Sequence, residues 1–293
     1  MNWQKSLKNK VKINEPLASK TTFKIGGRAG VFAEPEDIED LRSVIVSAKK
    51  YRISVVILGA GSNILVRDKG VSGVVLRLSS PKFKKIAFYD DCVLAGSGCT
   101  LARLIREASK RSLSGLECLA GIPGTVGGAL IMNAGAWGGC IGDLVEEVMI
   151  LDYNGKTKAI KKKDIKFNYR TSNLAKFIIL GAKLKLLKVR KREIEGKIKN
   201  FLAKRRQTQD NASPNAGCIF KNPDGNSAGK LIDLCGLKGR HVGGAVISRK
   251  HANFILNKRN AKARDVLELM GLIKDKVRNK FKVNLKPEIK IWG

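Results

Sequence analysis

One short segment, NAGCIFKNPDG at residues 215–225, holds the side chains best suited to chemistry. It places one thiol, Cys218, shortly before Lys221 and Asn222. A cysteine here could act as a nucleophile, a metal ligand, half of a disulfide, a proton donor or a packing side chain. A nucleophile is disfavoured, because neither of the two histidines has a sequence relation to the thiol that would identify an activating base. The other readings stay open on the residue types.

Cysteine spacing and apolar runs narrow the class of protein. The six cysteines form no C-x-x-C pair, whereas structural zinc sites use closely spaced ligand pairs, so we expect no metal. The N-terminal segment is charged and lacks the apolar core of a signal peptide, and the apolar run at 53–58 is too short to span a bilayer. The sequence therefore predicts a cytoplasmic protein, in which an even number of cysteines does not by itself imply disulfides.

Two glycine-rich loops point to a phosphate-bearing ligand. GAGSNI at 59–64 fails the Rossmann fingerprint because Ile64 stands at the last glycine position. GNSAGKL at 225–231 fails as a P-loop, because its glycines are too close and Leu231 replaces the magnesium-binding hydroxyl. The loops 59–63 and 121–128 each follow a predicted strand and can still form backbone nests for anions. Tight turns are the alternative, but both loops together favour cofactor binding.

The net charge of +32 is the most unusual bulk property. Such a charge favours nucleic-acid binding, but the lysines are spread over the whole chain rather than gathered on one element with interleaved aromatics. The alternative explanations of the charge are a basic proteome or a general attraction of small polyanionic ligands. We therefore expect no nucleic-acid partner.

Hydrophobic periodicity predicts an α+β protein with mixed sheets. Helical spacing occurs in four segments, at 35–51, 101–111, 192–207 and 263–281. Short strands are predicted around Gly26-Gly27 within 21–35, at 53–58 and at 73–78, and a terminal strand at 285–292. Several further strands lie between residues 92 and 189.

An ordered set of segments resembles a known family. These are TTFKIGG, LGAGSNILV, LAGIPGTVGGALIMNAGAWG, FNYRTS, GCIFKNP, AGKLID and GGAVISRKHANFILN, followed by the late Glu288. In this order they resemble the UDP-N-acetylenolpyruvoylglucosamine reductases in their short form, over about residues 10–293. The resemblance implies the two-subdomain FAD-binding fold of the vanillyl-alcohol oxidase/PCMH type plus a C-terminal α+β substrate-binding domain. We place the FAD-binding subdomains at 1–80 and 81–189 and the substrate domain at 190–293.

The resemblance also implies a reaction. NADPH reduces FAD, and hydride then passes to the enolpyruvyl ether of a UDP-sugar to make UDP-N-acetylmuramate for peptidoglycan. Arg170 matches the arginine that steadies the transient negative charge, a role that suits a forked guanidinium. Glu288 matches the acid that helps to hold the enolic intermediate. Cys218 stands where most relatives carry a serine proton donor, and a thiol with a reference pKa of about 8.5 is still mostly protonated at neutral pH.

Binding residues follow from the same resemblance. The substrate would contact Tyr169, Lys221 and Asn222. The FAD would be lined by Gly59, Ala60, Gly61, Ser62, Asn63, Gly121, Ile122, Pro123, Gly124, Gly127, Gly128, Ala129 and Asn133.

Two other functions remain as alternatives. One is another non-covalent FAD oxidoreductase of the same fold. The positions of both histidines, beyond residue 240, exclude a histidyl link in the FAD-binding subdomains and leave a cysteinyl link open. The other is a basic, non-catalytic nucleic-acid-binding protein. The chain departs from the family pattern at Asp210, where relatives commonly have proline, and this puts the local substrate loop in doubt. We expect a monomer that meets only small-molecule substrates.

Overall fold

The structure, a computed structural model, describes residues 11–210 and 212–293 and divides into two compact units. Of the described residues, the first unit holds 11–13, 31–60 and 73–205, and the second holds the remainder. The unit boundary falls inside three strands: β1 (Val11–Pro16), β2 (Arg28–Ala33) and β5 (Val71–Leu76). This division does not identify which segments bind cofactor or substrate. The boundaries at residues 80 and 189 therefore stay a prediction.

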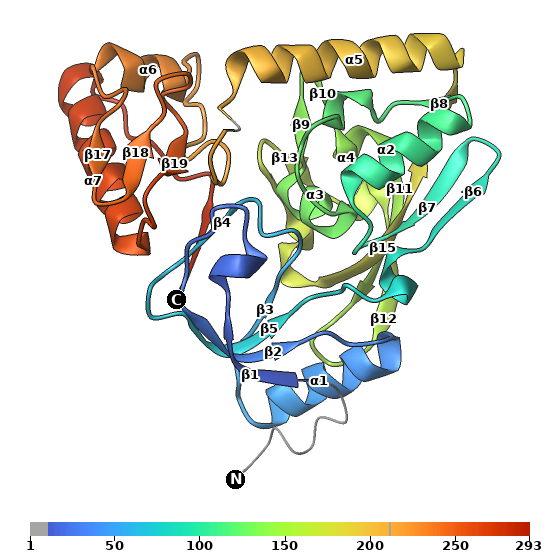
Figure 1. Ribbon diagram of the computed structural model, residues 1–293. Helices are drawn as coiled ribbons and strands as arrows, with labels where there is room; N and C mark the ends of the chain where they lie inside the picture. Colours follow the sequence, from blue (N-terminus) through green and yellow to red (C-terminus); the bar gives the residue numbers. More distant parts are fainter. Residues whose placement is uncertain (1–10, 211) are drawn as a thin grey trace. The chain divides into compact units, whose positions relative to one another are not determined.

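A five-stranded antiparallel sheet forms the centre of the first unit, in the order β12-β11-β15-β7-β6 (Figure 1). Helix α3 packs on β15 and β7, and helix α2 buries Leu101, Leu104 and Ile105 in the same core. The elements are β6 (Ile86–Tyr89), β7 (Cys92–Gly96), α2 (Leu101–Lys110), α3 (Val126–Met132), β11 (Val145–Leu151), β12 (Thr157–Lys161) and β15 (Ile178–Lys185).

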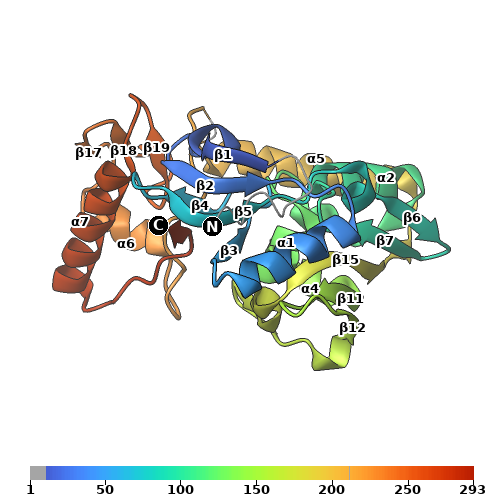
Figure 2. The same ribbon diagram turned by 90° about the horizontal axis from the view of Figure 1, so that it is seen from below.

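A second core of the first unit lies around helix α1 (Ile38–Lys50). Its apolar side, with Leu41, Val44 and Ile45, packs against β5 and against Leu151 of the large sheet. Asp37 caps the helix by accepting a hydrogen bond from the Asp40 N–H, and Glu39 and Asp40 in the first turn suit the helix dipole. Strand β3 (Val55–Ile57) pairs in parallel with β5, and Figure 2 shows α1 beside this strand.

The second unit is built on helix α7 (Ala263–Phe281), which has the predicted bounds. Its buried stripe includes Val266, Leu269 and Ile273, and each such side chain contributes about 1.5–3 kcal/mol by leaving water. In Figure 1 the helix lies in red next to a three-stranded sheet. The other elements are β4 (Ile64–Val66), α6 (Ala228–Leu234), β17 (His241–Val242), β18 (Ala245–Ile247), β19 (Ile255–Asn257) and β20 (Lys290–Trp292), and β20 pairs in parallel with β4.

Two strand predictions were wrong, each for a local reason. No strand forms between residues 21 and 27, because Lys24 adopts a left-handed backbone with φ of 58°, which interrupts an extended run. The terminal strand is shorter than predicted and is limited to β20. Pro287 makes only an isolated bridge with Phe220, because a proline has no N–H to give to a ladder.

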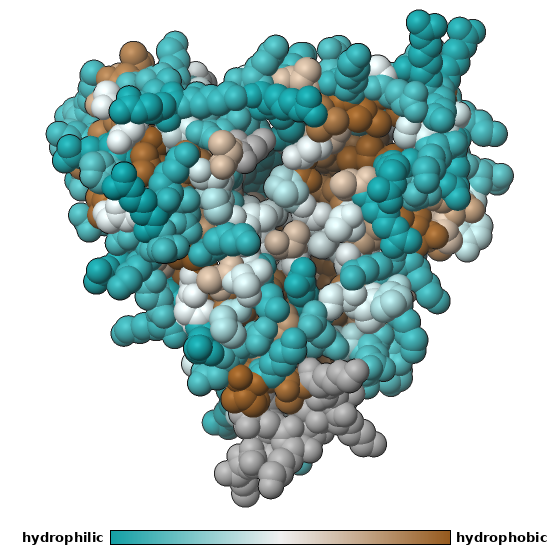
Figure 3. Space-filling model, viewed as in Figure 1, coloured by the Kyte–Doolittle hydropathy of each residue, from teal (hydrophilic) through white to brown (hydrophobic). Residues whose placement is uncertain are grey.

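Short strand pairs, a short helix and one long helix complete the first unit. They are β8 (Leu113–Ser114), β9 (Gly135–Ala136), β10 (Gly139–Cys140), α4 (Ile141–Leu144), β13 (Phe167–Asn168), β14 (Thr171–Ser172), β16 (Leu187–Lys188) and α5 (Lys191–Thr208), whose last turn passes into the second unit. Hydrophilic side chains cover most of the face drawn in Figure 3. Within the described part of the chain, every helix is too short or too polar to cross a membrane.

Candidate active site

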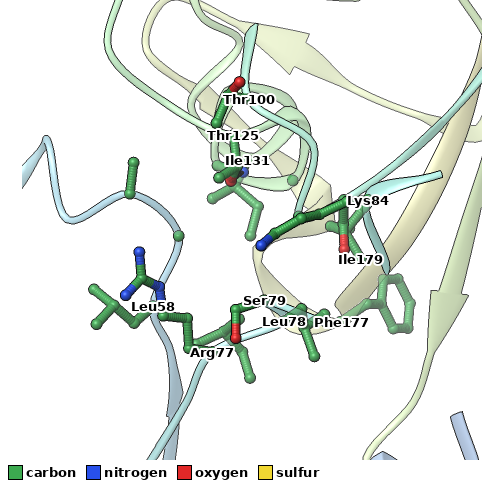
Figure 4. A pocket seen from close by; sticks show the side chains of 17 residues that line it. Leu58, Arg77, Leu78, Ser79, Lys84, Thr100, Thr125, Ile131, Phe177 and Ile179 are labelled. Atoms are coloured by element: carbon green, nitrogen blue, oxygen red, sulfur yellow. Dashed lines mark hydrogen bonds between the residues drawn. The ribbon is translucent and has the colours of Figure 1, made fainter. Parts of the chain in front are cut away.

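The first unit contains a cavity of about 180 Å³ between the end of β3, the start of α2 and the start of α3 (Figure 4). Its wall combines small residues, hydroxyls, cations and apolar side chains. The lining residues are Ile57, Leu58, Gly59, Ala60, Arg77, Leu78, Ser79, Lys84, Ser97, Gly98, Thr100, Thr125, Gly127, Gly128, Ile131, Phe177 and Ile179. The predicted cofactor residues Gly59, Ala60, Gly127 and Gly128 are thereby brought to one place.

Backbone hydrogen bonds hold the loops around this cavity. Leu58 N donates to Leu76 O at 2.7 Å, which fixes the loop after β3. The turn after β7 is held from two sides. Gly98 N donates to Phe83 O and Gly127 N donates to Ser97 O, both at 2.9 Å. The cavity is therefore shaped by the backbone before any ligand arrives.

Most glycines of the wall stand where a side chain has little or no room. A Cβ on Gly98 would lie 2.0 Å from Leu78 O, and one on Gly59 would lie 2.9 Å from Thr125 Oγ1. Gly128 differs, because a Cβ there would meet nothing closer than Thr125 Oγ1 at 3.6 Å and the residue is exposed. The protein itself does not need a glycine at 128. A ligand that approaches the backbone would need one.

Hydroxyl groups line the same wall. Thr100 and Thr125 cap α2 and α3, each accepting a hydrogen bond from a backbone N–H one turn later. Ser97 is 4% exposed, and its Oγ has no hydrogen-bond partner among the described residues. A buried hydroxyl without a partner is costly, so a ligand that supplied one would recover that free energy.

Arg170 lies in the turn of a hairpin that is tied to the end of α3. Its backbone is left-handed, with φ of 54°, and its Nη1 donates to Gly135 O at 2.9 Å. Asn133, the left-handed C-cap of α3, donates from Nδ2 to Asn168 O at 3.2 Å and accepts from Gly142 N at 3.1 Å. Its amide therefore holds the hairpin that carries Arg170. A contact of Asn133 with the cofactor stays a prediction.

Cys218 lies in the second unit, in a segment flanked by two others. On one side Ile219 N donates to Asn253 O, and on the other Glu288 N donates to Ile219 O, both at 2.8 Å. The segment that carries Glu288 is also held by Asn63, whose Nδ2 donates a hydrogen bond to Glu288 O at 3.3 Å. The backbones that carry Cys218 and Glu288 are therefore immediate neighbours, although the two residues are far apart in the sequence.

The remaining predicted residues have the following places. Lys221 continues the Cys218 segment through its N–H bond to Lys286 O at 2.9 Å. Asn222 accepts a hydrogen bond from Ala228 N, which fixes the start of α6. Tyr169 is 53% exposed beside Arg170 in the first unit. Four predicted cofactor residues precede α3 without lining the cavity, namely Gly121, Ile122, Pro123 and Gly124. Ala129 is buried in α3. Gly61 and Ser62 belong to the second unit.

Sequence reasoning missed several residues of the cavity, including Arg77, Lys84, Ser97 and Thr100. The segment AGSGCT at 95–100 did carry a signal, since it is a strand followed by a glycine turn and a helix-capping threonine. Arg77 and Lys84 carried none, because nothing distinguishes them from the other basic residues of a chain with 57 lysines and arginines.

Burial makes two other thiols, those of Cys99 and Cys118, harder to deprotonate. Burial, followed by the charge of Glu117, raises the pKa of the Cys118 thiol to about 11. Burial also raises the pKa of Cys99, and all six cysteines are free. Among residues 11–210 and 212–293, no group of three or more His, Cys, Asp or Glu side chains could hold a metal ion.

Family models match most of the chain. A model described as an FAD binding domain matches residues 29–161, which include most of the cavity wall. A model described as the C-terminal domain of UDP-N-acetylenolpyruvoylglucosamine reductase matches residues 178–292.

Full-length relatives agree with these matches. The chain is 41% identical to the UDP-N-acetylenolpyruvoylglucosamine reductase of Desulforamulus reducens, over 99% of this chain and 96% of the relative. It is 43% identical to reductase 2 of Symbiobacterium thermophilum, over 95% of this chain and 91% of the relative.

Solved structures give the same picture. The crystal structure of this reductase, MurB, from Thermus caldophilus is similar with a TM-score of 0.84 and 36% identity, covering 98% of this chain and 99% of that chain. Phl p 4.0202, a glucose dehydrogenase, is similar with a TM-score of 0.50 and 15% identity over 65% of this chain and 45% of its own, a likeness of fold alone.

Proposed function

The chain belongs to the UDP-N-acetylenolpyruvoylglucosamine reductase family, and on that premise we propose that Arg170, Cys218 and Glu288 carry its catalysis. It is an FAD-dependent oxidoreductase that reduces the enolpyruvyl ether of UDP-N-acetylglucosamine enolpyruvate to UDP-N-acetylmuramate, a peptidoglycan precursor, with NADPH as reductant. The predicted fold class, α+β with a two-subdomain FAD-binding fold and a C-terminal domain, is confirmed.

The wall of the first unit's cavity suits the binding of part of FAD. Glycines at 59, 98 and 127 keep its wall free of side chains, so a dinucleotide can approach the backbone. The unsatisfied hydroxyl of Ser97 and the exposed backbone of Gly128 are features that a bound ligand would use. FAD supplies the hydride once NADPH has reduced it, and the chain's own residues do the rest.

Cys218 acts as the general acid. After hydride addition to the vinyl group, the neighbouring carbon needs one proton delivered from a single face, and the thiol Sγ–H donates it. The backbone ladder that holds residues 218–221 supports this role, because it fixes the position of the donor. The closeness of the Cys218 and Glu288 backbones is the observation that carries the assignment, since it joins two family-matched catalytic residues.

Arg170 stabilises the negative charge that develops toward the substrate carboxylate. A forked guanidinium matches a carboxylate with two hydrogen bonds, and preorganised charge is commonly the largest catalytic contribution. Its hydrogen bond to Gly135 O and the turn in which it lies support a fixed position. Glu288 holds the enolic form of the substrate by a hydrogen bond. Tyr169, Lys221 and Asn222 contact the substrate.

We further propose a cytoplasmic monomer with small-molecule substrates and without a nucleic-acid partner. Six free thiols suit a reducing compartment. The three-part division at residues 80 and 189 belongs to the same proposal.

One assay tests the function. The purified protein, loaded with FAD, should absorb at about 450 nm as oxidised flavins do and release its flavin on denaturation. It should oxidise NADPH over many turnovers only when the enolpyruvyl UDP-sugar is present to reoxidise the flavin. Oxidation of simple alcohols in place of this reaction would favour another flavin oxidoreductase. A colourless protein that retains nucleic acid would favour the non-catalytic alternative.

A further inference from the structure

Two cations of the cavity wall are not explained by the protein's own contacts. Arg77 follows β5 and Lys84 ends a short turn before β6, and both side chains are half-buried and line the cavity. In Figure 4 the Lys84 ammonium reaches into the cavity and the Arg77 guanidinium lies beside Leu58. No aspartate or glutamate is among the residues that line the cavity. The wall is therefore cationic.

Neither side chain has a counter-ion in the described part of the chain. No ion pair and no side-chain hydrogen bond joins Arg77 or Lys84 to residues 11–210 or 212–293. Glu34 is a carboxylate bonded to the cavity wall, and it accepts a hydrogen bond from Ser79 Oγ at 2.5 Å. Two like charges at one cavity without a counter-ion repel each other, and an anion between them removes that cost.

The backbones that carry both cations are fixed. Arg77 N donates to Ala33 O at 3.0 Å. Lys84 lies between two anchored neighbours, since Phe83 O accepts from Gly98 N at 2.9 Å and Lys85 O accepts from Gly96 N at 2.8 Å. Lys84 O itself accepts from Arg103 Nη1 at 3.1 Å. Both side chains therefore start from fixed backbone positions at the cavity, so a ligand would have to order only the side chains themselves.

We propose that Arg77 and Lys84 form a cation pair that binds the diphosphate of FAD. The inference rests on the proposed function, which supplies the cofactor. Three ligands of the reaction carry a diphosphate, namely FAD, NADPH and the UDP-sugar. FAD is favoured because the same cavity contains Gly59, Gly127 and Gly128 and lies mostly within the segment matched by the FAD-binding model.

The test is the affinity of the flavin-free protein for FAD, followed by flavin fluorescence at several salt concentrations. Arg77→Gln and Lys84→Gln should each weaken FAD binding by about tenfold, because each removes one charge-assisted contact. Each should also flatten the dependence of affinity on salt. Riboflavin, which has no phosphate, should bind all variants equally. Lys84→Arg, which keeps the charge, should retain most of the affinity.

The matched control is Lys85→Gln, because Lys85 is exposed next to Lys84 and does not line the cavity. It should leave FAD affinity and its salt dependence unchanged. Thermal unfolding of each flavin-free variant separates lost binding from lost folding.

Three results would overturn the proposal. The first is unchanged FAD affinity in both glutamine variants. The second is unchanged FAD affinity with a raised KM for NADPH or for the UDP-sugar, which would assign the cations to that diphosphate instead. The third is an equal loss of riboflavin binding, which would indicate general damage to the cavity. Failure of the unaltered chain to bind FAD at all would instead reject the proposed function.

Discussion

The cavity of the first unit and the Cys218 segment of the second unit are built on different principles. The cavity is made mostly of backbone, because glycines at 59, 98 and 127 remove side chains and hydrogen bonds between loops fix its wall. The Cys218 segment is also held by backbone, but its proposed chemistry depends on single side-chain atoms at 218 and 288. The first region should therefore be sensitive to added atoms, and the second to the loss of particular ones.

Cys218→Ala should have the largest effect. Removing the proton donor should lower turnover by about 10²–10⁴-fold, the usual contribution of a general acid. Reduction of FAD by NADPH should stay largely intact, because this half-reaction does not need the thiol. Stopped-flow absorbance of the flavin separates the two half-reactions.

Cys218→Ser is the matched control, since a hydroxyl can still donate a proton. It should keep appreciable turnover. Near-normal turnover in Cys218→Ala would show that another group delivers the proton. The Cys218 segment would then not depend on this side-chain atom, and that part of the contrast between the two regions would be wrong.

A pair of glycine substitutions tests the cavity side. Gly98→Ala should lower the free energy of unfolding by about 2–3 kcal/mol, because its Cβ would lie 2.0 Å from Leu78 O and the backbone would have to move. Gly128→Ala should leave the flavin-free protein as stable or slightly more stable, since 128 lies inside α3 and has room for a Cβ.

FAD titration completes this comparison. Gly128→Ala should weaken FAD binding if the cofactor approaches the backbone there, without any loss of stability. Unchanged FAD affinity in Gly128→Ala would place the cofactor away from the start of α3.

A pH effect is expected in the second unit. Asn253 N donates to His251 Nδ1 at 3.2 Å, and the Asn253 side chain in turn bonds both Phe220 N and Phe220 O, two residues from Cys218. Burial lowers the pKa of His251 from its usual value of 6.5. The folded protein therefore keeps this ring neutral where the unfolded chain would bind a proton.

The sign of the effect follows from that difference. The contribution of His251 to stability is complete above about pH 6.5 and is lost as the pH falls through that value toward the lower folded pKa. Urea unfolding of the natural chain should therefore lose stability more steeply below pH 6.5 than that of His251→Gln. Identical slopes for the two proteins would mean that His251 is protonated in the folded state.

The sequence predicted best what depends on local pattern. The bounds of α7 followed from a regular apolar stripe, and Gly59, Ala60, Gly127 and Gly128 were predicted as cofactor residues and line one cavity. Where a pattern was interrupted by a single backbone feature, as at Lys24 or Pro287, the predicted strand was too long.

What could not be predicted depends on distant pairing. Arg77 reaches the cavity because β5 pairs with β3, and Lys84 because residues 83 and 85 bond the turn after β7. The backbones of Cys218 and Glu288 lie close together because Glu288 N donates a hydrogen bond to Ile219 O. Composition and periodicity contain no trace of these contacts. The proposed catalytic residues could still be predicted, because they match the ordered segments of the family. Arg77 and Lys84 match no such segment, so they could not be predicted.

Ser97→Ala should have the smallest effect and the most specific one. The Ser97 hydroxyl is buried without a partner among the described residues, so its removal should stabilise the flavin-free protein by up to about 1 kcal/mol. The same change should weaken FAD binding by about threefold to tenfold, if the cofactor provides the missing partner. Thermal unfolding without flavin and FAD titration measure the two effects separately.

Ser79→Ala is the contrasting variant on the same wall. Ser79 Oγ donates to Glu34 Oε1 at 2.5 Å, so its loss should destabilise the flavin-free protein. Opposite signs for the two serines would show that the cavity keeps one hydroxyl for its ligand and one for its own fold. A loss of stability in Ser97→Ala would mean that its hydroxyl has a structural partner, such as a bound water, and is not reserved for the cofactor.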